Sequence, residues 1–420
     1  MLSVRGAVLT ACASIAVAQV NGTTNSSTSN CNPYVFDYEG NRYNWYDDDE
    51  VVYNGTTLLG NITNIVTAVV ANSTFANYPD EYPYPPGIVI TIQTAEGIFE
   101  KGYGYADAGM QTPMKTNARV EVGSNTKVFV GTLLMQAVEQ GLMDVNDYMT
   151  SYIPDVAVTV VNSDKITIRH LMTHNTGLFD YGDDIIRNSL GSRQNMTESY
   201  SPEELVNSIK GRTVGFAPGN CTEFSYSNTN YVLVGLILEA VHNKSLVELM
   251  NEGILQPLNL TGTTFFEGSP DANSLDSHGY YWKYDTMTSS DAILLDTTRW
   301  NLNQGWAAGA IISTGRDMVT FARALGKGEL FAKGTETFEL MNGYFRTSNM
   351  ALYGFSGYGY GLGESFAPDL HAHGGQTLGF RSTFVFSVDQ DFQVFIAQNE
   401  AAESTAAVEA NQFTTFMPSL

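Results

Sequence analysis

Basic residues are scarce in this sequence. The 420 residues include 21 Lys and Arg against 44 Asp and Glu, which gives a formal net charge of −23 at pH 7. Nucleic acids and anionic membranes attract proteins through clusters of basic side chains. The charge balance therefore argues against binding to either. It favours a protein of an acidic medium or a heavily solvated secreted protein, and it identifies no substrate.

Several familiar motifs are also missing. The chain has no Gly-x-Ser-x-Gly elbow, phosphate-binding loop, dinucleotide fingerprint or heptad repeat. His170 and His174 are four residues apart on an expected helix, but no Glu follows His170 as in the His-Glu-x-x-His zinc motif, and no third ligand is evident. We therefore expect neither a metal nor a cofactor, and we interpret both histidines as core or capping residues.

Cysteine is rare, with only Cys12, Cys31 and Cys221. Residues 1–18 hold a basic residue followed by a short apolar stretch, which is typical of a secretory signal peptide. A retained membrane anchor is the alternative. The apolar run is too short to span a bilayer, which argues against that alternative. Secretion would remove Cys12 and leave an even pair in an oxidising compartment, which predicts a disulfide between Cys31 and Cys221. Two free or buried thiols are the other interpretation.

Acceptor sequences for N-glycosylation are frequent and concentrate near the N-terminus. Nine occur, at Asn21, Asn25, Asn54, Asn61, Asn72, Asn195, Asn220, Asn243 and Asn259. Residues 19–84 are therefore interpreted as an exposed, glycosylated segment of unknown role in a secreted, extracellular protein. The alternative is chance, because Asn, Ser and Thr are common in this chain.

Strand patterns occur at both ends of the remaining chain, and helical patterns occur between them. Two antiparallel hairpins are predicted, one around a turn at 95–97 and one around a turn at 389–391. Helices are expected at 58–71, over much of 142–300, and at the Ala-rich 401–417. This order predicts an α+β fold over residues 85–420, in which an antiparallel sheet flanked by helices carries an inserted all-α lobe.

Residues 121–142 combine a helix with chemistry at its start. Apolar residues recur at helical spacing and Gly141 stands at the expected C-terminus, which predicts a helix with one buried face. Ser124 lies at the N-terminus, and Lys127 follows one turn later on the same face. A buried neutral lysine can take the serine proton, while the helix N-terminus offers N–H groups to an oxyanion. The alternative is a serine N-cap beside a surface lysine.

Two further motifs follow in the same chain. Tyr226-Ser-Asn228 precedes an apolar helix that begins near Tyr231, and His373-Gly-Gly375 precedes the C-terminal hairpin. Taken alone, the tyrosine could be a core residue, the asparagine a helix cap and the glycines a turn. Together with Ser124-x-x-Lys127, they resemble the three motifs of the serine β-lactamase and penicillin-recognising superfamily. The resemblance is strongest to the branch of class C β-lactamases, D-alanyl-D-alanine carboxypeptidases and related esterases, over roughly residues 85–400.

The resemblance implies an active site between the sheet and the helical lobe. It implies an acylated Ser124, a neighbouring Lys127 in proton transfer, and Tyr226 as the base or anion that shuttles protons. It also implies that Asn228 binds the acyl side of the substrate, that His373 stands where relatives have lysine or histidine, and that Gly375 belongs to the substrate-binding strand. The backbone N–H groups of Ser124 and Gln376 would form the oxyanion hole.

These residues predict a hydrolase of carboxylic esters or small amides. Relatives that act on β-lactams or D-alanyl peptides usually have Thr or Ser between the two outer residues of the third motif, where the hydroxyl helps to hold the substrate carboxylate. Here Gly374 supplies no hydroxyl. The alternatives are a D-alanyl-D-alanine carboxypeptidase or β-lactamase, and a non-catalytic binding protein that retains the fold. The sequence does not indicate an oligomeric state.

Overall fold

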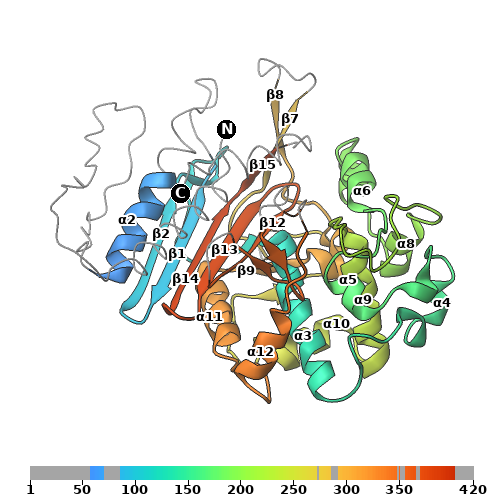
Figure 1. Cartoon of the computed structure of the whole chain (residues 1–420). Coiled ribbons are helices and arrows are strands. Elements are labelled where there is room, and N and C mark those ends of the chain that lie inside the picture. Colours follow the sequence, from blue (N-terminus) through green and yellow to red (C-terminus); the bar gives the residue numbers. More distant parts are fainter. Residues whose placement is uncertain are drawn as a thin grey trace.

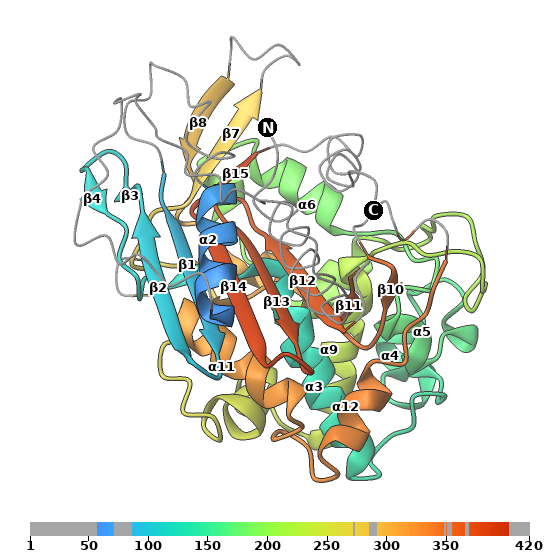
Figure 2. The same ribbon diagram turned by 60° about the vertical axis from the view of Figure 1, so that its left-hand side comes forward.

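The computed structural model describes residues 57–70, 86–271, 274–284, 292–347, 350, 355–365 and 369–402. Its centre is a seven-stranded antiparallel sheet (Figures 1 and 2). In sheet order the strands are β10 (Gly357–Tyr358), β11 (Gly363–Glu364), β12 (Leu370–Gln376), β13 (Arg381–Ser387), β14 (Phe392–Gln398), β1 (Ile88–Thr94) and β2 (Gly97–Tyr103). The hairpins β1–β2 and β13–β14 join through the pairing of β1 with β14. Both hairpin predictions, and the prediction that the two ends of the chain share one sheet, are confirmed.

Helices cover both faces of this sheet (Figure 2). On one face α2 (Leu58–Val70), close to the expected 58–71, packs over β1 and β2 through the buried side chains of Leu59, Ile62 and Val66. On the other face α11 (Gly315–Gly326) approaches so closely that a Cβ on Gly315 would lie 2.0 Å from Thr91 Oγ1. The central strands are therefore buried on both sides, and neither of their faces is open to solvent.

The helical lobe is built around α9 (Asn228–His242), whose residues from Thr229 to Leu238 are all buried. Capping boxes begin three of its short helices, at Thr167, Ser201 and Ser245, because each hydroxyl accepts from the third helical N–H. The described helices of the lobe are α4 (Pro154–Ala157), α5 (Ile168–Met172), α6 (Gly182–Ser189), α7 (Arg193–Met196), α8 (Pro202–Asn207), α9 and α10 (Leu246–Met250). A further helix, α12 (Thr335–Met341), follows α11 in the chain.

Strands return earlier than the sequence pattern indicates. Helices were expected to about residue 300, but β6 (Thr264–Phe265), β7 (Tyr280–Tyr284) and β8 (Ala292–Asp296) precede that point. β6 pairs with β9 (Ile311–Ser313), which pairs with β5 (Val120–Glu121), and β3 (Tyr105–Asp107) pairs with β4 (Thr112–Pro113). The expectation of a helix at 401–417 is wrong at its start. β15 (Glu400–Ala402) runs parallel to β7, and the later residues lie outside the described part.

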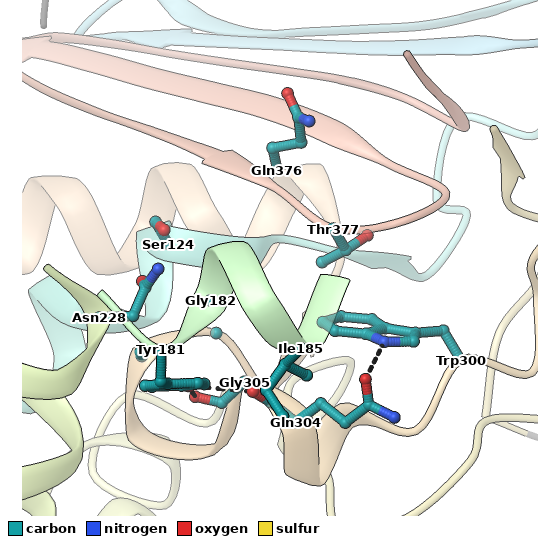
Figure 3. A pocket seen from close by; sticks show the side chains of 12 residues that line it. Ser124, Tyr181, Gly182, Ile185, Asn228, Trp300, Gln304, Gly305, Gln376 and Thr377 are labelled. Carbon is teal, nitrogen blue, oxygen red and sulfur yellow. Dashed lines mark hydrogen bonds between the residues drawn. The ribbon is translucent and has the colours of Figure 1, made fainter. Parts of the chain in front are cut away.

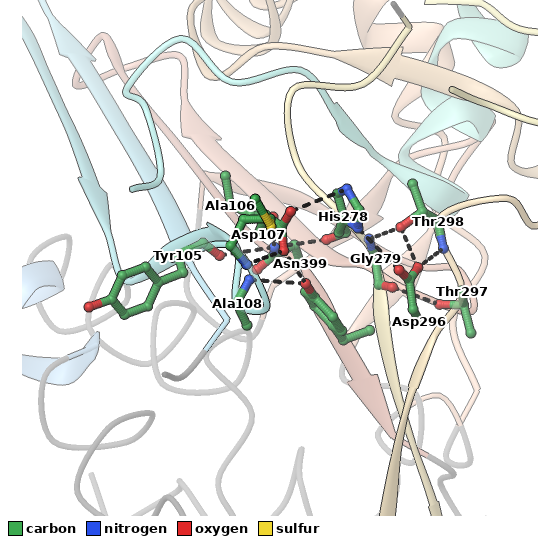
Figure 4. A network of polar contacts seen from close by, with 12 residues as sticks. Tyr105, Ala106, Asp107, Ala108, His278, Gly279, Asp296, Thr297, Thr298 and Asn399 are labelled. Carbon is green, nitrogen blue, oxygen red and sulfur yellow. Dashed lines mark hydrogen bonds and ion pairs between the residues drawn. The ribbon is translucent and has the colours of Figure 1, made fainter. Parts of the chain in front are cut away.

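A polar network joins this β7–β8 ribbon to β3 and to Asn399, which lies between β14 and β15 (Figure 4). His278 Nδ1 lies 3.1 Å from Asp296 Oδ2, and its Nε2 lies 3.7 Å from Asp107 Oδ2. The hydrogen bond with Asp296 raises the pKa of His278. Asn399 Nδ2 donates to the carbonyls of Ala106 and His278, at 3.1 and 2.8 Å. The network therefore fixes the ribbon against β3 and the end of β14.

Several predictions concern residues outside the described part. These are the signal peptide, Cys31, and the acceptors Asn21, Asn25, Asn54 and Asn72. Cys221 is exposed and is not bonded to any described cysteine, so its pairing with Cys31 stays a prediction. Asn61, Asn243 and Asn259 are exposed, as an acceptor must be, whereas Asn195 and Asn220 are partly buried. None of the helices that the structure describes is both long and apolar enough to span a bilayer.

Candidate active site

The nucleophile candidate stands on a tight turn before a buried helix. A 3-10 turn over Gly123–Asn125 carries Ser124 and leads into α3 (Thr126–Glu139). Gly123 has φ of +53°, and a Cβ there would lie 2.7 Å from Gln376 N, so only glycine fits this approach. At the other end Gly141 N–H and Leu142 N–H close a Schellman motif on the carbonyls of Val138 and Ala137.

The prediction of one buried face on this helix is too narrow. α3 lies between the sheet and the lobe, and eleven of its fourteen residues are buried. Lys127 is among them, with an exposed fraction of 0%. The alternative of a surface lysine is therefore wrong, because tertiary packing covers the face that the sequence pattern left open.

Side-chain bonds tie the turn to the sheet. Asn125 Nδ2 donates to Ser382 Oγ at 2.7 Å, and Ser382 Oγ donates to the carbonyl of Val122 at 2.8 Å. A Cβ on Gly375 would lie 1.8 Å from the same carbonyl. The second glycine of the third motif is therefore needed for the close approach of β12 to the turn that carries Ser124.

Lys127 makes three polar contacts through Nζ. Its distances are 2.9 Å to Ser124 Oγ, 2.7 Å to Asn228 Oδ1 and 2.8 Å to the carbonyl oxygen of Ala308. Burial lowers the pKa of Lys127 to about 7, against a weaker, opposite effect from the nearby Asp180 carboxylate. The neutral amine is therefore accessible near neutral pH.

Asn228 and Asp180 stand behind the lysine. Asn228 is the first residue of α9, and its Nδ2 donates to Asp180 Oδ2 at 2.9 Å. The N–H of Gly182 donates to the other Asp180 oxygen, also at 2.9 Å. Burial raises the pKa of Asp180. Sequence reasoning missed Asp180, which lies 48 residues before Asn228 and shares no spacing pattern with it.

Aromatic rings form the back of the site. Lys127 Nζ lies 4.9 Å from the Tyr226 ring centroid and 5.5 Å from that of Tyr231. The buried His174 ring lies 4.2 Å from Tyr226, and its Nδ1 accepts from the N–H of Ser227 at 3.1 Å. Burial keeps the pKa of His174 well below its usual value. The second motif therefore faces the first, as the resemblance implies.

His373 is buried in β12, and both of its ring nitrogens have partners. Nδ1 lies 2.7 Å from the carbonyl of Gly374, which only accepts, so Nδ1 carries the hydrogen. Nε2 lies 2.8 Å from the hydroxyl of Tyr358, which then donates to it. The Tyr226 and His373 ring centroids are 6.4 Å apart. A catalytic role for His373 stays a prediction.

The end of β12 directs one N–H towards the turn that carries Ser124. Thr377 N–H donates to the carbonyl of Phe380 at 2.9 Å across the β12–β13 turn. Bonds alternate along an antiparallel pair, so the N–H of Gln376 points away from β13. On that side stands Gly123, directly before Ser124. A role for the N–H groups of Gln376 and Ser124 in an oxyanion hole stays a prediction.

A small pocket opens beside Ser124 (Figure 3). Its cavity volume is about 60 Å³, room for a few water-sized groups. Trp300 forms part of its wall, and Nε1 of its indole donates to Gln304 Oε1 at 2.7 Å. No lining residue is charged; the lining comprises Ser124, Tyr181, Gly182, Ile185, Asn228, Trp300, Gln304, Gly305, Ala308, Gly309, Gln376 and Thr377.

Comparison with known proteins agrees with this geometry. A model of the Beta-lactamase family matches residues 71–415, which is most of the chain. The chain belongs to the β-lactamase family. The resemblance drawn from the three motifs is confirmed, and so is the α+β fold with its antiparallel sheet and helical lobe.

Three proteins similar to this β-lactamase family chain are 23–28% identical to it over the aligned regions. Protein flp of Staphylococcus aureus (strain NCTC 8325 / PS 47) is 28% identical over 182 residues, which cover 43% of the chain and 35% of flp. The chain thus spans about a third of the length of flp. The putative penicillin-binding protein PbpX of Bacillus subtilis (strain 168) is 23% identical over 80% of the chain and 75% of PbpX. A D-stereospecific amidohydrolase from Streptomyces sp. has a TM-score of 0.64 and 26% identity over 79% of the chain and 95% of its own.

A second acidic residue that the sequence did not single out lies beside Thr377, which lines the pocket. Glu121, in β5, is buried three residues before Ser124, and neither carboxyl oxygen has a hydrogen-bond partner among the described residues. Burial raises its pKa to about 8, and the Thr377 side chain nearby lowers it by a smaller amount. Glu121 is therefore protonated at neutral pH.

The two histidines once considered as metal ligands have structural contacts. His170 Nδ1 accepts from the N–H of Thr167 at 3.3 Å and completes a helix cap, while His174 accepts from Ser227. Within the described ranges no three His, Cys, Asp or Glu side chains gather as a metal site. The helix that bears His170 ends at Met172, so His174 lies outside the helix on which both histidines were expected.

Proposed function

We propose that this β-lactamase family protein is a secreted serine hydrolase that acts through an acyl-enzyme on carboxylic esters or small amides. The contact of 2.9 Å between Lys127 Nζ and Ser124 Oγ carries the proposal. A buried amine with a pKa of about 7 can accept the serine proton, whereas an exposed lysine with a pKa of about 10.4 stays charged at neutral pH.

In the proposed reaction, Ser124 Oγ attacks the acyl carbon and its proton passes to Lys127 or Tyr226. The carbonyl electron pair moves onto its oxygen, which accepts hydrogen bonds from the N–H groups of Ser124 and Gln376. The bond from the acyl carbon to the alcohol or amine then breaks, and the leaving group takes the proton. A water molecule attacks the acyl-enzyme in the same way, which releases the acid and regenerates Ser124.

The substrate that fits the site best carries a small uncharged acyl group. The pocket beside Ser124 has no charged lining residue and only about 60 Å³ of cavity volume. On the strand side Gly374 adds no hydroxyl for a substrate carboxylate, which removes a hydrogen bond worth about 1.5–3 kcal/mol. We therefore expect weak activity on penicillins and D-alanyl-D-alanine peptides. The similarity to a D-stereospecific amidohydrolase supports small amides as substrates.

The test compares kcat/KM for short-chain p-nitrophenyl esters, amino-acid amides of both hands, nitrocefin and a D-alanyl-D-alanine peptide. Esters or small amides should be preferred, and kcat/KM should rise with pH through about 7 as Lys127 loses its proton. A preference for nitrocefin or the peptide would instead assign a β-lactamase or carboxypeptidase. Failure of a serine-directed fluorophosphonate to add one label would favour the non-catalytic binding protein.

A further inference from the structure

Asp180 lies between α5 and α6, outside the group of residues that line the pocket. Its two carboxylate oxygens accept from the N–H of Gly182 and from Asn228 Nδ2, both at 2.9 Å. An ionised carboxylate can only accept hydrogen bonds. Asp180 therefore requires a donor from Asn228 at this position.

That requirement orients the Asn228 amide. An amide side chain has a donor end and an acceptor end, and its hydrogen-bond partners decide which end points where. With Nδ2 held by Asp180, Oδ1 must face Lys127, which lies 2.7 Å away. Figure 3 shows the Asn228 amide directed towards Ser124.

The orientation of Asn228 in turn decides how the Lys127 amine is used. A neutral amine has two N–H hydrogens and one lone pair. Two of its three contacts, Asn228 Oδ1 and the Ala308 carbonyl, are acceptors only and take both hydrogens. The lone pair is then left for the third contact, the hydroxyl of Ser124 at 2.9 Å.

We propose that Asp180 is a positioning residue that sets the direction of the hydrogen-bond chain from Asp180 through Asn228 and Lys127 to Ser124, so that the neutral amine presents its lone pair to the serine hydroxyl. The proposal rests on the proposed function, because it assumes that Lys127 accepts the serine proton. Every link is a contact of 2.7–2.9 Å between named atoms.

Other titratable groups face the lysine, and they do not share this role. His174 is neutral because burial lowers its pKa, and its Nδ1 is turned towards Ser227. Tyr226 and Tyr231 present their rings to Nζ. His373, on β12, has both nitrogens engaged by Tyr358 and Gly374. Asp180 is thus the acidic group that acts on Lys127 from the lobe side.

Asp180→Asn tests the proposal, because Gly182 and Asn228 donate to different carboxylate oxygens and an amide keeps only one of these two oxygens. In part of the molecules Asn228 would turn over, and its Nδ2 would occupy the Lys127 lone pair. We expect kcat to fall roughly 10- to 100-fold with KM nearly unchanged, as for a misdirected proton acceptor. Asp180→Glu should recover part of the loss, because it restores an acceptor-only group. The exposed Asp183→Asn, three residues later at the start of α6, is the matched control and should keep its kcat.

A double-mutant cycle tests whether Asp180 acts through Asn228. In an Asn228→Ala background, Asp180→Asn should cause no further fall in kcat. Additive losses would overturn the proposal, because they would mean that Asp180 acts independently of the amide. Equal losses in Asp180→Asn and Asp183→Asn would also overturn it and would assign the effect to overall charge.

A readout without substrate separates this proposal from the proposed function. With ¹³Cε-labelled lysine, the NMR titration of Lys127 should shift to lower pH by roughly half a unit to one unit in Asp180→Asn and stay in place in Asp183→Asn. A shift without any esterase or amidase activity in the wild type would support the chain and reject the proposed function. Hydrolysis by the wild type with neither titration nor kcat altered by Asp180→Asn would overturn the chain and leave the proposed function intact.

Discussion

The two walls of the site are built in different ways. On the lobe wall the chemistry comes from side chains, and each polar atom of Lys127, Asn228 and Asp180 has a partner. On the strand wall the proposed chemistry comes from backbone groups of β12, and the carboxyl oxygens of Glu121, near Thr377, have no hydrogen-bond partner within the described part of the chain. In the proposed mechanism, proton transfer would therefore depend on hydrogen-bond direction, and oxyanion binding would depend on how closely two backbones approach.

The largest effect is expected on the lobe wall. Ser124→Ala and Lys127→Ala should each lower kcat for the preferred ester by about 10³-fold or more, because the nucleophile and its proton acceptor act as a unit. Stopped assays with p-nitrophenyl esters measure the change, and the exposed Lys165→Ala serves as control. Unchanged turnover in Ser124→Ala would remove the serine from the mechanism.

On the strand wall, a substitution that adds a side-chain atom should disrupt the structure by a steric clash. Gly375→Ala places a Cβ 1.8 Å from the carbonyl of Val122, so the strand must move away from the nucleophile turn. We expect a loss of about 3 kcal/mol or more in the free energy of unfolding, together with loss of acylation. Urea denaturation measures it against Gly109→Ala, where the nearest atom is 3.4 Å away. Equal stability of the two variants would contradict the close approach.

Glu121 should make stability depend on pH. Its folded pKa of about 8 exceeds the usual 4.5. Its stabilising contribution to the free energy of unfolding is therefore fully present below about pH 4.5 and is lost as the pH rises through 8. Glu121→Gln should therefore flatten the fall in the free energy of unfolding between pH 5 and pH 9, by up to a few kcal/mol. The exposed Glu329→Gln is the control. A wild-type curve that rises across this range would contradict the assignment.

The smallest effect concerns the missing hydroxyl of the third motif. Gly374→Thr should raise kcat/KM for a D-alanyl-D-alanine peptide about tenfold relative to an uncharged ester, the value of one modest hydrogen bond to a carboxylate. The ratio of the two rates is the measurement, because it cancels any general loss of activity. A ratio that stays constant would mean that Gly374 does not decide the substrate preference.

The sequence by itself determined what depends on near neighbours along the chain. The spacing of Ser124 and Lys127 places them one helical turn apart, and the helix caps and the two hairpins follow from local patterns. The order of three motifs was enough to indicate the family. It was not enough to describe the surroundings of the lysine, because those come from segments more than 50 residues apart.

Only the tertiary structure decided which atoms complete the site. Asp180 meets Asn228 because residues 179–181, before α6, are hydrogen-bonded to the start of α9, and Ala308 reaches Lys127 from 181 residues away. Packing on every side made α3 a buried helix, and pairing with β7 made residues 400–402 a strand where composition favoured a helix. Such contacts leave no periodic trace in a sequence, because burial and long-range pairing depend on the whole fold, whereas helical and strand periods depend only on neighbouring residues.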